Sequence, residues 1–409
     1  MKRILSILIV CLLIILAGCK ENIETEETKR EMTNHSVYKE GIDYEDSLWS
    51  KPQFYKDPSK DRTDLGIEAL WIRSDYLSLE SYAFAYLGIP NNPSGKAVVL
   101  IHGGGGTAYY EWVQMWMSHG FIALAIDLEG HVPKETGNLH SYPQDLYIKS
   151  DYTTPHNQNY NDSHLPIEET WMHYATRTAI IANSFLHNLD IVDPYAVGIA
   201  GISWGGIITS IVTGYDDRFA FSIPIYSTLN QAETDSAIAT YYQNNPNALV
   251  WDDDEALSKV QTPVHLIVSN VDQFGKLEST TMTLSRLNKG SVTIIKDLLH
   301  SSAIAAECIE QYTFAEKMVS KTDIVRFEVS PSFLESEVSI SIPNDTTIEQ
   351  AIIVYSTEEN NISASWSKRN INLNGDRLTY NIPEGTTMFF LSVIDRFGNT
   401  WSTPLIENH

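Results

Sequence analysis

A single serine near the middle of the chain lies between two glycines, in the stretch "GIAGISWGGIITS" of residues 198–210. Gly201 stands two residues before Ser203, and Gly205 stands two residues after it. An apolar run precedes the motif and a helical pattern follows it, which predicts a sharp strand-to-helix turn that projects the hydroxyl group. Side chains at the two glycine positions would collide in such a turn, and the helix N-terminus favours developing negative charge. The pattern therefore predicts a nucleophilic serine.

A serine hydroxyl needs a base, and the base needs an acid that orients it. Two later apolar strands end near suitable side chains, because "TPVHLIVSNVDQFG" ends with Asp272 and "SVTIIKDLLHSSA" leads to His300. In open parallel sheets, sites gather at the carboxyl ends of the strands. We therefore predict Ser203 as nucleophile, His300 as general base and Asp272 as the orienting acid.

Other titratable residues fit these roles less well. His265 lies inside a predicted strand, and three further histidines lie on predicted helices before or outside the site, namely His119, His173 and His187. Asp297 lies only three residues before His300, too close along the chain to orient its imidazole. The histidines show no paired-ligand spacing, so we predict neither a metal site nor a cofactor.

Four consecutive glycines follow an early apolar strand in "KAVVLIHGGGG". Backbone N–H groups in such a loop can approach a substrate oxygen closely. We predict an oxyanion hole formed by the N–H of Gly104, with Gly105 as second choice, and by the N–H of Trp204, the residue after the nucleophile. No Lys-Ser/Thr pair follows the glycines, which excludes a phosphate-binding loop.

Residues 130–165 interrupt the pattern with a stretch rich in Tyr, His, Asn and Pro. Structureless loops of more than about 12–15 residues are uncommon in compact domains unless they serve a site. We expect this insertion to shape a binding site, the alternative being a surface decoration. His131 is expected to bind substrate together with Trp112 and Trp116 of a predicted helix, although packing of these tryptophans between helix and sheet is equally open.

The elements around these residues alternate between continuous apolar strands and helices, one of which has an apolar stripe from Ile167 to Leu189. This alternation predicts a parallel sheet covered on both faces. After about residue 321 come short alternating strands with polar turns, which predict a β-sandwich of about 85 residues. Trp366 and Trp401 are expected in its core rather than on a sugar-binding surface.

The chain of 409 residues has a formal net charge of -24, which argues against nucleic-acid binding because that requires clustered Lys and Arg.

Lys2 and Arg3 precede an apolar run too short to span a bilayer, which ends in the sequence LAGC at Cys19. This segment resembles a bacterial lipobox. The resemblance implies cleavage before Cys19, lipidation of Cys19 and a lipid anchor in the cell envelope, at the periplasmic or outer face of the outer membrane; a secretory signal with a coincidental cysteine is the alternative.

We therefore expect four segments along the chain. They are a signal peptide (1–18), a flexible acidic tether (19–50), a catalytic domain (51–322) and a β-sandwich of fibronectin III or immunoglobulin type (323–409). Cys308 is the only cysteine left after cleavage apart from the anchor, so no internal disulfide is expected.

Three stretches resemble a known group of enzymes: "YLGIPNNPSGKAVVLIHGGGGTAYYEW", "DPYAVGIAGISWGG" and "DDRFAFSIPIY". They are similar to the acetyl xylan esterase, dienelactone hydrolase and prolyl-oligopeptidase-like branch of the α/β-hydrolases, over residues 66 to 320. The resemblance implies a doubly wound, mostly parallel sheet and an acyl-enzyme mechanism on Ser203. The expected function is a serine carboxylesterase that removes acetyl or methyl esters from polysaccharide. The alternatives are a dienelactone-hydrolase-type or dipeptidyl- or acylaminoacyl-peptidase-like hydrolase, and a catalytically silent glycan-binding lipoprotein.

Overall fold

The structure, a computed structural model, describes residues 42, 44–252, 255–328, 337–358 and 364–408. The predicted signal peptide and Cys19 lie outside these residues. Within the described part of the chain, no helix has the length and hydropathy to cross a membrane. The helices are η2 (Asp46–Trp49), α2 (Tyr110–Ser118), α3 (Pro143–Leu146), η3 (Ile167–Glu169), α4 (Trp171–His187), α5 (Trp204–Tyr215), α6 (Ala239–Asn244), η4 (Pro246–Trp251), η5 (Glu255–Lys259), α7 (Leu277–Arg286), α8 (Ser302–Glu307) and α9 (Ile309–Val319).

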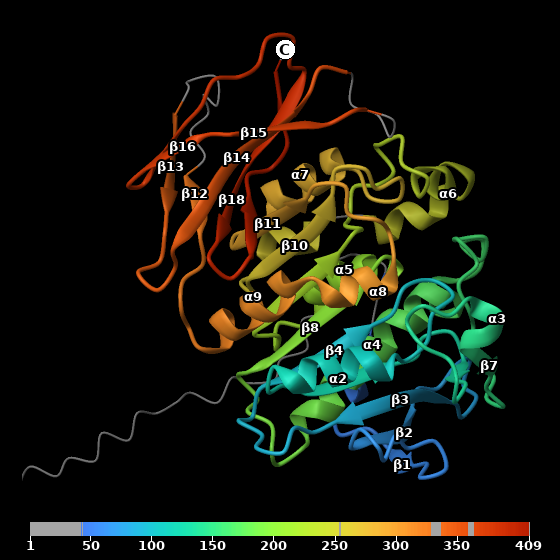
Figure 1. The fold of residues 1–409 in the computed structure, drawn as a ribbon. Coiled ribbons are helices and arrows are strands. Elements are labelled where there is room, and N and C mark those ends of the chain that lie inside the picture. The colour runs from blue at the N-terminus through green and yellow to red at the C-terminus, as the bar shows by residue number, and fades with distance from the viewer. Residues whose placement is uncertain (1–41, 43, 253–254, 329–336, 359–363, 409) are drawn as a thin grey trace, which may run out of the picture. The chain divides into compact units, whose positions relative to one another are not determined.

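The strands divide between an α/β part and a C-terminal part (Figure 1). Those of the α/β part are β1 (Phe54–Lys56), β2 (Ile67–Arg73), β3 (Tyr82–Gly88), β4 (Ala97–Ile101), β5 (Ile122–Ile126), β6 (His131–Pro133), β7 (Tyr147–Lys149), β8 (Val197–Ile202), β9 (Phe221–Ile225), β10 (Val264–Ser269) and β11 (Gly290–Ile295). Those of the C-terminal part are β12 (Arg326–Glu328), β13 (Glu337–Ser341), β14 (Ile348–Ser356), β15 (Ser367–Asn370), β16 (Asn372–Asn374), β17 (Arg377–Thr379), β18 (Met388–Asp395), β19 (Thr400–Ser402) and β20 (Ile406–Glu407).

The α/β part is built on a sheet with the order β1-β2-β3-β5-β4-β8-β9-β10-β11. The first strands pair antiparallel, whereas β5, β4, β8, β9, β10 and β11 pair in parallel. Apolar side chains alternate along the strands between two core clusters, of which one includes residues of α2 and α9 and the other residues of α4 and α5. Strands that are apolar on both faces require such helices on both sides. The predicted doubly wound, mostly parallel α/β sheet is therefore confirmed.

The C-terminal strands continue this sheet rather than standing apart from it. Strand β19 pairs antiparallel with β11, at Val292 and Ser402, and the sheet goes on through β18, β14 and β15. A second sheet, β12-β13-β17-β16, contributes Val338 and Leu378 to the same core cluster as Ile353 and Leu391 of the first. The predicted C-terminal β-sandwich is confirmed, with one layer joined to the central sheet. Pairing with β19 covers backbone groups of β11 that an exposed edge strand would leave unpaired.

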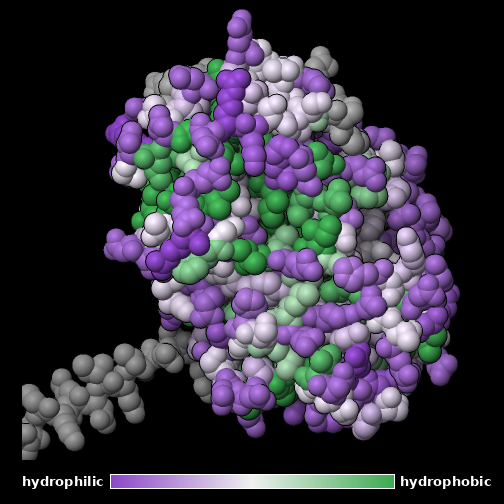
Figure 2. All heavy atoms as spheres, viewed as in Figure 1, coloured by the Kyte–Doolittle hydropathy of each residue, from purple (hydrophilic) through white to green (hydrophobic). Residues whose placement is uncertain are grey.

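The junction between the two parts is well packed. Trp401, only 1% exposed, lies 5.4 Å from the ring of His265 in β10, and His265 stacks on Phe314 of α9 at 4.8 Å. Trp401 is thus a core residue, as predicted, whereas Trp366 is half-buried against Phe390. Figure 2 shows apolar residues gathered on this face where the C-terminal strands meet the α/β part, with hydrophilic residues over much of the rest.

The predicted tether reaches too far along the chain. Ile42, Tyr44, Leu48 and Trp49 are buried and belong to the core cluster that includes α4. The ring of Tyr44 stacks on His173 at 5.1 Å, and its hydroxyl bonds to Thr176 at 2.6 Å. The prediction of a flexible segment up to residue 50 is therefore wrong at its end, because four apolar side chains within eight residues pack against α4.

The buried ring of His265 leads to a prediction about acid stability. Burial, and to a smaller extent the charge of Arg326, lowers the pKa of its imidazole from 6.5 to about 3. The unfolded chain binds a proton at this ring below about pH 6.5, whereas the folded protein does not until about pH 3. Titration of His265 therefore leaves the free energy of unfolding unchanged above about pH 6.5. Below that pH it lowers the free energy of unfolding, by up to about 1.4 kcal/mol per pH unit. We expect His265→Gln to flatten the pH dependence of the free energy of unfolding, measured by urea denaturation between pH 7 and pH 4.

The matched control is His140→Gln, which changes an exposed histidine and should keep the wild-type slope. The slope, rather than the absolute stability, is the decisive quantity, because His265→Gln also alters hydrogen bonds to Ser291 and Thr293. An unchanged slope in His265→Gln would contradict the prediction.

Candidate active site

Ser203 stands alone between the end of β8 at Ile202 and the start of α5 at Trp204. Its backbone has φ 58° and ψ -118°, a left-handed conformation that costs energy for a residue with a side chain. A Cβ atom on Gly201 would collide with the carbonyl of Gly205, and one on Gly205 would collide with the carbonyl of Ile101 at the end of β4. The two glycines thus permit the strained turn that presents the hydroxyl group. Gly205 is required because a side chain there would collide with β4, and not because it would collide with Ser203.

The structure brings the three predicted side chains together in one hydrogen-bonded chain. His300 Nε2 lies 2.8 Å from Ser203 Oγ, and His300 Nδ1 lies 2.7 Å from Asp272 Oδ2. The Asp272 side chain is fully buried, and its other oxygen accepts the N–H of Phe274 at 2.8 Å. Because a carboxylate only accepts, His300 Nδ1 carries the proton and Nε2 is left to accept the serine proton. This geometry suits nucleophilic attack by the serine on a carbonyl carbon.

Two aromatic residues hold the His300 loop, and sequence reasoning missed both. Tyr226, directly after β9, stacks its ring on His300 at 4.4 Å. Its hydroxyl group shares its one proton between the carbonyl oxygens on either side of His300, those of Leu299 (2.7 Å) and Ser301 (3.0 Å). Phe274 packs on the imidazole at 4.8 Å. A tyrosine just past a parallel strand was the available signal, since that edge of the sheet carries the other site residues.

The glycine loop after β4 lies against the nucleophile. A Cβ atom on Gly103 would be 3.1 Å from Ser203 Cβ, and one on Gly104 would meet the indole of Trp204. Trp204 is the first residue of α5, where a backbone N–H has no partner within the helix. The N–H of Gly105, the second choice for the oxyanion hole, instead donates to Glu129 Oε1 at 2.8 Å. Gly104 and Trp204 therefore lie next to each other, and their role in the oxyanion hole stays a prediction.

A pocket of about 620 Å³ opens beside Ser203 and His300. The insertion supplies more than half of the residues that line it, and its β6 and β7 form an antiparallel hairpin. The polar and aromatic lining from the insertion comprises His131, Tyr147, Lys149, Ser150, Tyr152, Thr154, His156, Asn157 and Asn159. The opposite lining includes Trp204, Ile238, Tyr241 and Phe274. The insertion thus forms a wall of the pocket, where sequence analysis expected a binding site.

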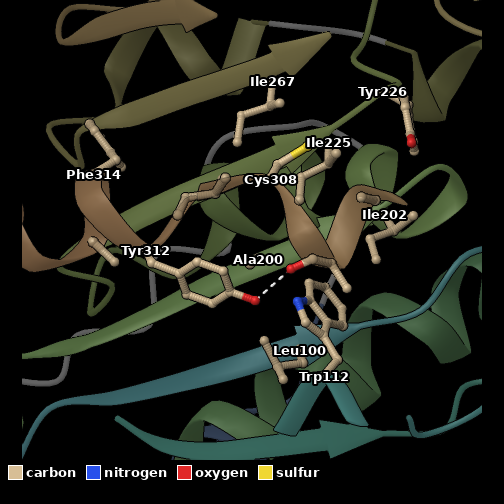
Figure 3. Close-up of a cluster of buried hydrophobic side chains, with 14 of the residues drawn as sticks. Leu100, Trp112, Ala200, Ile202, Ile225, Tyr226, Ile267, Cys308, Tyr312 and Phe314 are labelled. Atoms are coloured by element: carbon tan, nitrogen blue, oxygen red, sulfur yellow. Dashed lines mark hydrogen bonds between the residues drawn. The ribbon is translucent and has the colours of Figure 1, made fainter. Parts of the chain in front are cut away.

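Trp112 and Trp116 do not reach this pocket, which corrects their predicted role in substrate binding. Both rings are at most 1% exposed and pack between α2 and the sheet. Figure 3 shows Trp112 beside Tyr312, whose hydroxyl donates to the carbonyl of Ala306 at 2.6 Å. Trp112 Nε1 itself donates to Gln311 at 3.1 Å. Their helical spacing reflects burial of one face of α2, which was the alternative left open by the sequence.

His131 does line the pocket, but its ring is nearly buried between structural partners. Its Nδ1 donates to the carbonyl of Gly106 at 2.7 Å, and its ring stacks on Tyr147 at 3.5 Å. Burial lowers the pKa of this imidazole and so disfavours its protonated form. His131 therefore supports the glycine loop in addition to facing the pocket, and its predicted contact with substrate stays a prediction.

The residues set aside by sequence analysis lie in other environments. His265 is buried within β10, His119 stacks on Tyr312, and the carboxylate of Asp297 pairs with Lys296. Cys308 is a free, buried thiol, and burial raises its pKa to about 12. Among the described residues, no group of three His, Cys, Asp or Glu side chains is arranged to hold a metal ion.

Strand order and loop positions together identify the architecture, because the oxyanion loop follows β4, the nucleophile β8, the acid β10 and the histidine β11. The fold is that of an α/β-hydrolase. Its hydrogen-bonded Ser203, His300 and Asp272 have the geometry of a Ser-His-Asp catalytic triad.

Comparisons with known proteins find similar structures rather than similar sequences. No protein-family model matches the chain, and no curated protein matches its sequence significantly. Acetyl xylan esterase 1 from Thermoanaerobacterium sp. JW/SL YS485 is 15% identical with a TM-score of 0.49, covering 66% of this chain and 92% of that chain. Acetyl xylan esterase from Paenibacillus sp. R4 is 15% identical with a TM-score of 0.49, covering 69% and 97%. Est1E from Butyrivibrio proteoclasticus with bound ferulic acid is 14% identical with a TM-score of 0.41, covering 61% and 98%.

The contact between Asp272 and His300 can be tested by Asp272→Asn. An amide in this position can donate to Nδ1, which favours the tautomer that leaves Nε2 unable to accept the serine proton. We expect kcat for p-nitrophenyl acetate to fall roughly 10⁴-fold with little change in KM. Asp297→Asn, at the other acid near His300, is the control and should retain wild-type kcat. A fall of less than tenfold in Asp272→Asn would show that Asp272 does not orient the histidine.

Proposed function

We propose that this protein is a serine carboxylesterase that removes small acyl groups, acetyl above all, from a neutral polysaccharide. The observation that carries the proposal is the chain of contacts from Asp272 through His300 to Ser203, open to a pocket with one polar and one apolar wall. Hydrogen-bonding groups combined with aromatic rings suit a sugar, and the apolar side chains suit a small acyl group.

The reaction follows from the contacts at Ser203. Its Oγ attacks the ester carbonyl carbon while the hydroxyl proton passes to His300 Nε2. The N–H groups of Gly104 and Trp204 donate to the oxyanion of the tetrahedral intermediate. Its collapse breaks the bond to the sugar oxygen, which takes the proton from His300 and leaves as an alcohol. A water molecule, deprotonated by His300, then attacks the carbonyl carbon of the acyl-enzyme. The bond to Ser203 Oγ breaks, the serine oxygen takes the proton back from His300, and the carboxylic acid leaves.

The choice of a neutral glycan rests on charge. The chain carries a formal net charge of -24, which repels a polyanion such as a pectin with free carboxyl groups. This charge favours an acetylated, uncharged chain over a methyl-esterified acidic one.

The substrate proposal is tested by measuring both products on two polymers. We expect the protein to release acetate from acetylated xylan faster than it releases methanol from methyl-esterified pectin. Ser203→Ala should lower both this activity and the hydrolysis of p-nitrophenyl acetate at least 10³-fold. Ser118→Ala, at an exposed serine, is the control and should keep both activities. Faster methanol release, or cleavage of peptide nitroanilides alone, would contradict the proposal.

We further propose that the protein is anchored to the bacterial cell envelope through lipid on Cys19. The basic start, the short apolar run and the lipobox-like LAGC sequence support this proposal. The full chain expressed in a bacterium should partition into the detergent phase of Triton X-114, whereas Cys19→Ser should partition into the aqueous phase. Cys11→Ser, which changes a cysteine inside the apolar run, is the control and should behave as wild type. Detergent partitioning of Cys19→Ser would refute lipidation at this position.

A further inference from the structure

Residues 103–106, called here the oxyanion loop, have a distinctive pattern of backbone hydrogen bonds. The N–H of Gly106 donates to the carbonyl of Gly103 at 3.0 Å, which closes a tight turn. The N–H of Gly105 donates to Glu129 Oε1 at 2.8 Å. Two N–H groups of the loop are therefore used inside the protein, while Gly104 lies beside Trp204 and lines the pocket.

The segment that holds this loop is itself well ordered by a buried carboxylate. Asp127 Oδ2 accepts the backbone N–H of Glu129 at 3.1 Å and that of His131 at 2.7 Å. His131 Nδ1 in turn donates to the carbonyl of Gly106 at 2.7 Å. The segment 127–131 thus contacts the oxyanion loop at two successive residues, once through a carboxylate and once through an imidazole.

Glu129 is well suited to accept a hydrogen bond and poorly suited to contribute a charge. Its side chain lines the pocket although the residue is only 7% exposed, and burial raises the pKa of its carboxyl group. A full negative charge beside the oxyanion hole would oppose the oxyanion, whereas a carboxyl oxygen accepts the Gly105 N–H in either protonation state. The position of the acceptor oxygen is therefore what the site requires.

We propose that Glu129 is a positioning residue, whose carboxyl oxygen holds the N–H of Gly105 and thereby orients the N–H of Gly104 toward the substrate carbonyl oxygen. Glu129 acts through the oxyanion loop and does not take part in proton transfer. The inference rests on the proposed ester hydrolysis by Ser203, and it adds the residue that shapes the oxyanion hole.

Three variants separate the acceptor from the charge. Glu129→Gln keeps an acceptor oxygen at the same reach but cannot ionise, Glu129→Asp keeps an ionisable carboxyl group but withdraws its oxygen, and Glu129→Ala removes both. Because loss of one oxyanion donor costs about 10²–10³-fold in kcat, we expect a displaced donor to cost about 10–100-fold in Glu129→Asp and Glu129→Ala. Glu129→Gln should stay within about threefold of wild type, and KM for p-nitrophenyl acetate should change little in all three.

A second measurement reports on the hole without turnover. Phenylboronic acid adds to the serine and mimics the tetrahedral intermediate, so its affinity should fall in parallel with kcat across the series. Glu135→Gln and Glu135→Asp, at an exposed carboxylate of the insertion, are the controls and should match wild type in both measurements. Thermal unfolding identifies any variant that fails to fold.

The outcomes divide cleanly. Equal losses of kcat in folded Glu129→Gln and Glu129→Asp would overturn the inference, because an acceptor oxygen alone would then not be enough. Wild-type kcat in Glu129→Ala would also overturn it. So would a change in KM with no change in kcat. If Glu129→Asp and Glu129→Ala do not fold, a loss of more than tenfold in folded Glu129→Gln still overturns the inference, and retained kcat and boronate affinity support it. Absence of Ser203-dependent hydrolysis in the wild type would instead refute the proposed function.

Discussion

The parallel backbone pairing of β4, β8, β9, β10 and β11 is the constraint on which the site depends. Ile101 of β4 pairs with Gly201 of β8, and Ser269 of β10 pairs with Ile295 of β11, so these strands end side by side. Four loops that are far apart along the chain leave the sheet at the same edge. The order of the strands, and not any local motif, brings the serine, the acid and the histidine within hydrogen-bonding distance.

Polar contacts between loops then set the distances that the strands alone leave undetermined. Tyr226 clamps the carbonyls on both sides of His300, and Glu129 and His131 hold adjacent residues of the oxyanion loop. Each of these side chains bonds to backbone, so it restricts the path of a loop rather than contacting the reacting atoms. The strained turn at Ser203 persists because the surrounding sheet and helix determine its conformation.

The C-terminal strands stabilise the edge of the central sheet that carries the histidine loop. Because β19 pairs with β11, the strand that precedes His300 has a neighbour on both sides. Trp401 and Phe314 enclose His265 on the next strand, which joins the sandwich to the α/β core through apolar contacts. The β-sandwich is thus part of the scaffold that supports the histidine loop, whatever it contributes to binding of a polymer.

The amino-acid sequence by itself determined the elements and the identity of the reacting groups. Continuous apolar strands require burial on both faces, and a serine between two close glycines requires a sharp turn, so both could be predicted from local patterns.

Tertiary structure decided what depends on distance between remote segments. An apolar helical stripe looks the same whether it faces a core or a pocket, which is why Trp112 and Trp116 were misplaced. The roles of Glu129 and Tyr226 arise from bonds to backbone groups of distant residues, and no periodicity along the chain records such bonds. The sequence also did not predict the burial of Tyr44 or the pairing of β19 with β11. A short segment carries no local pattern that identifies its partner, because the contact forms only in the folded protein.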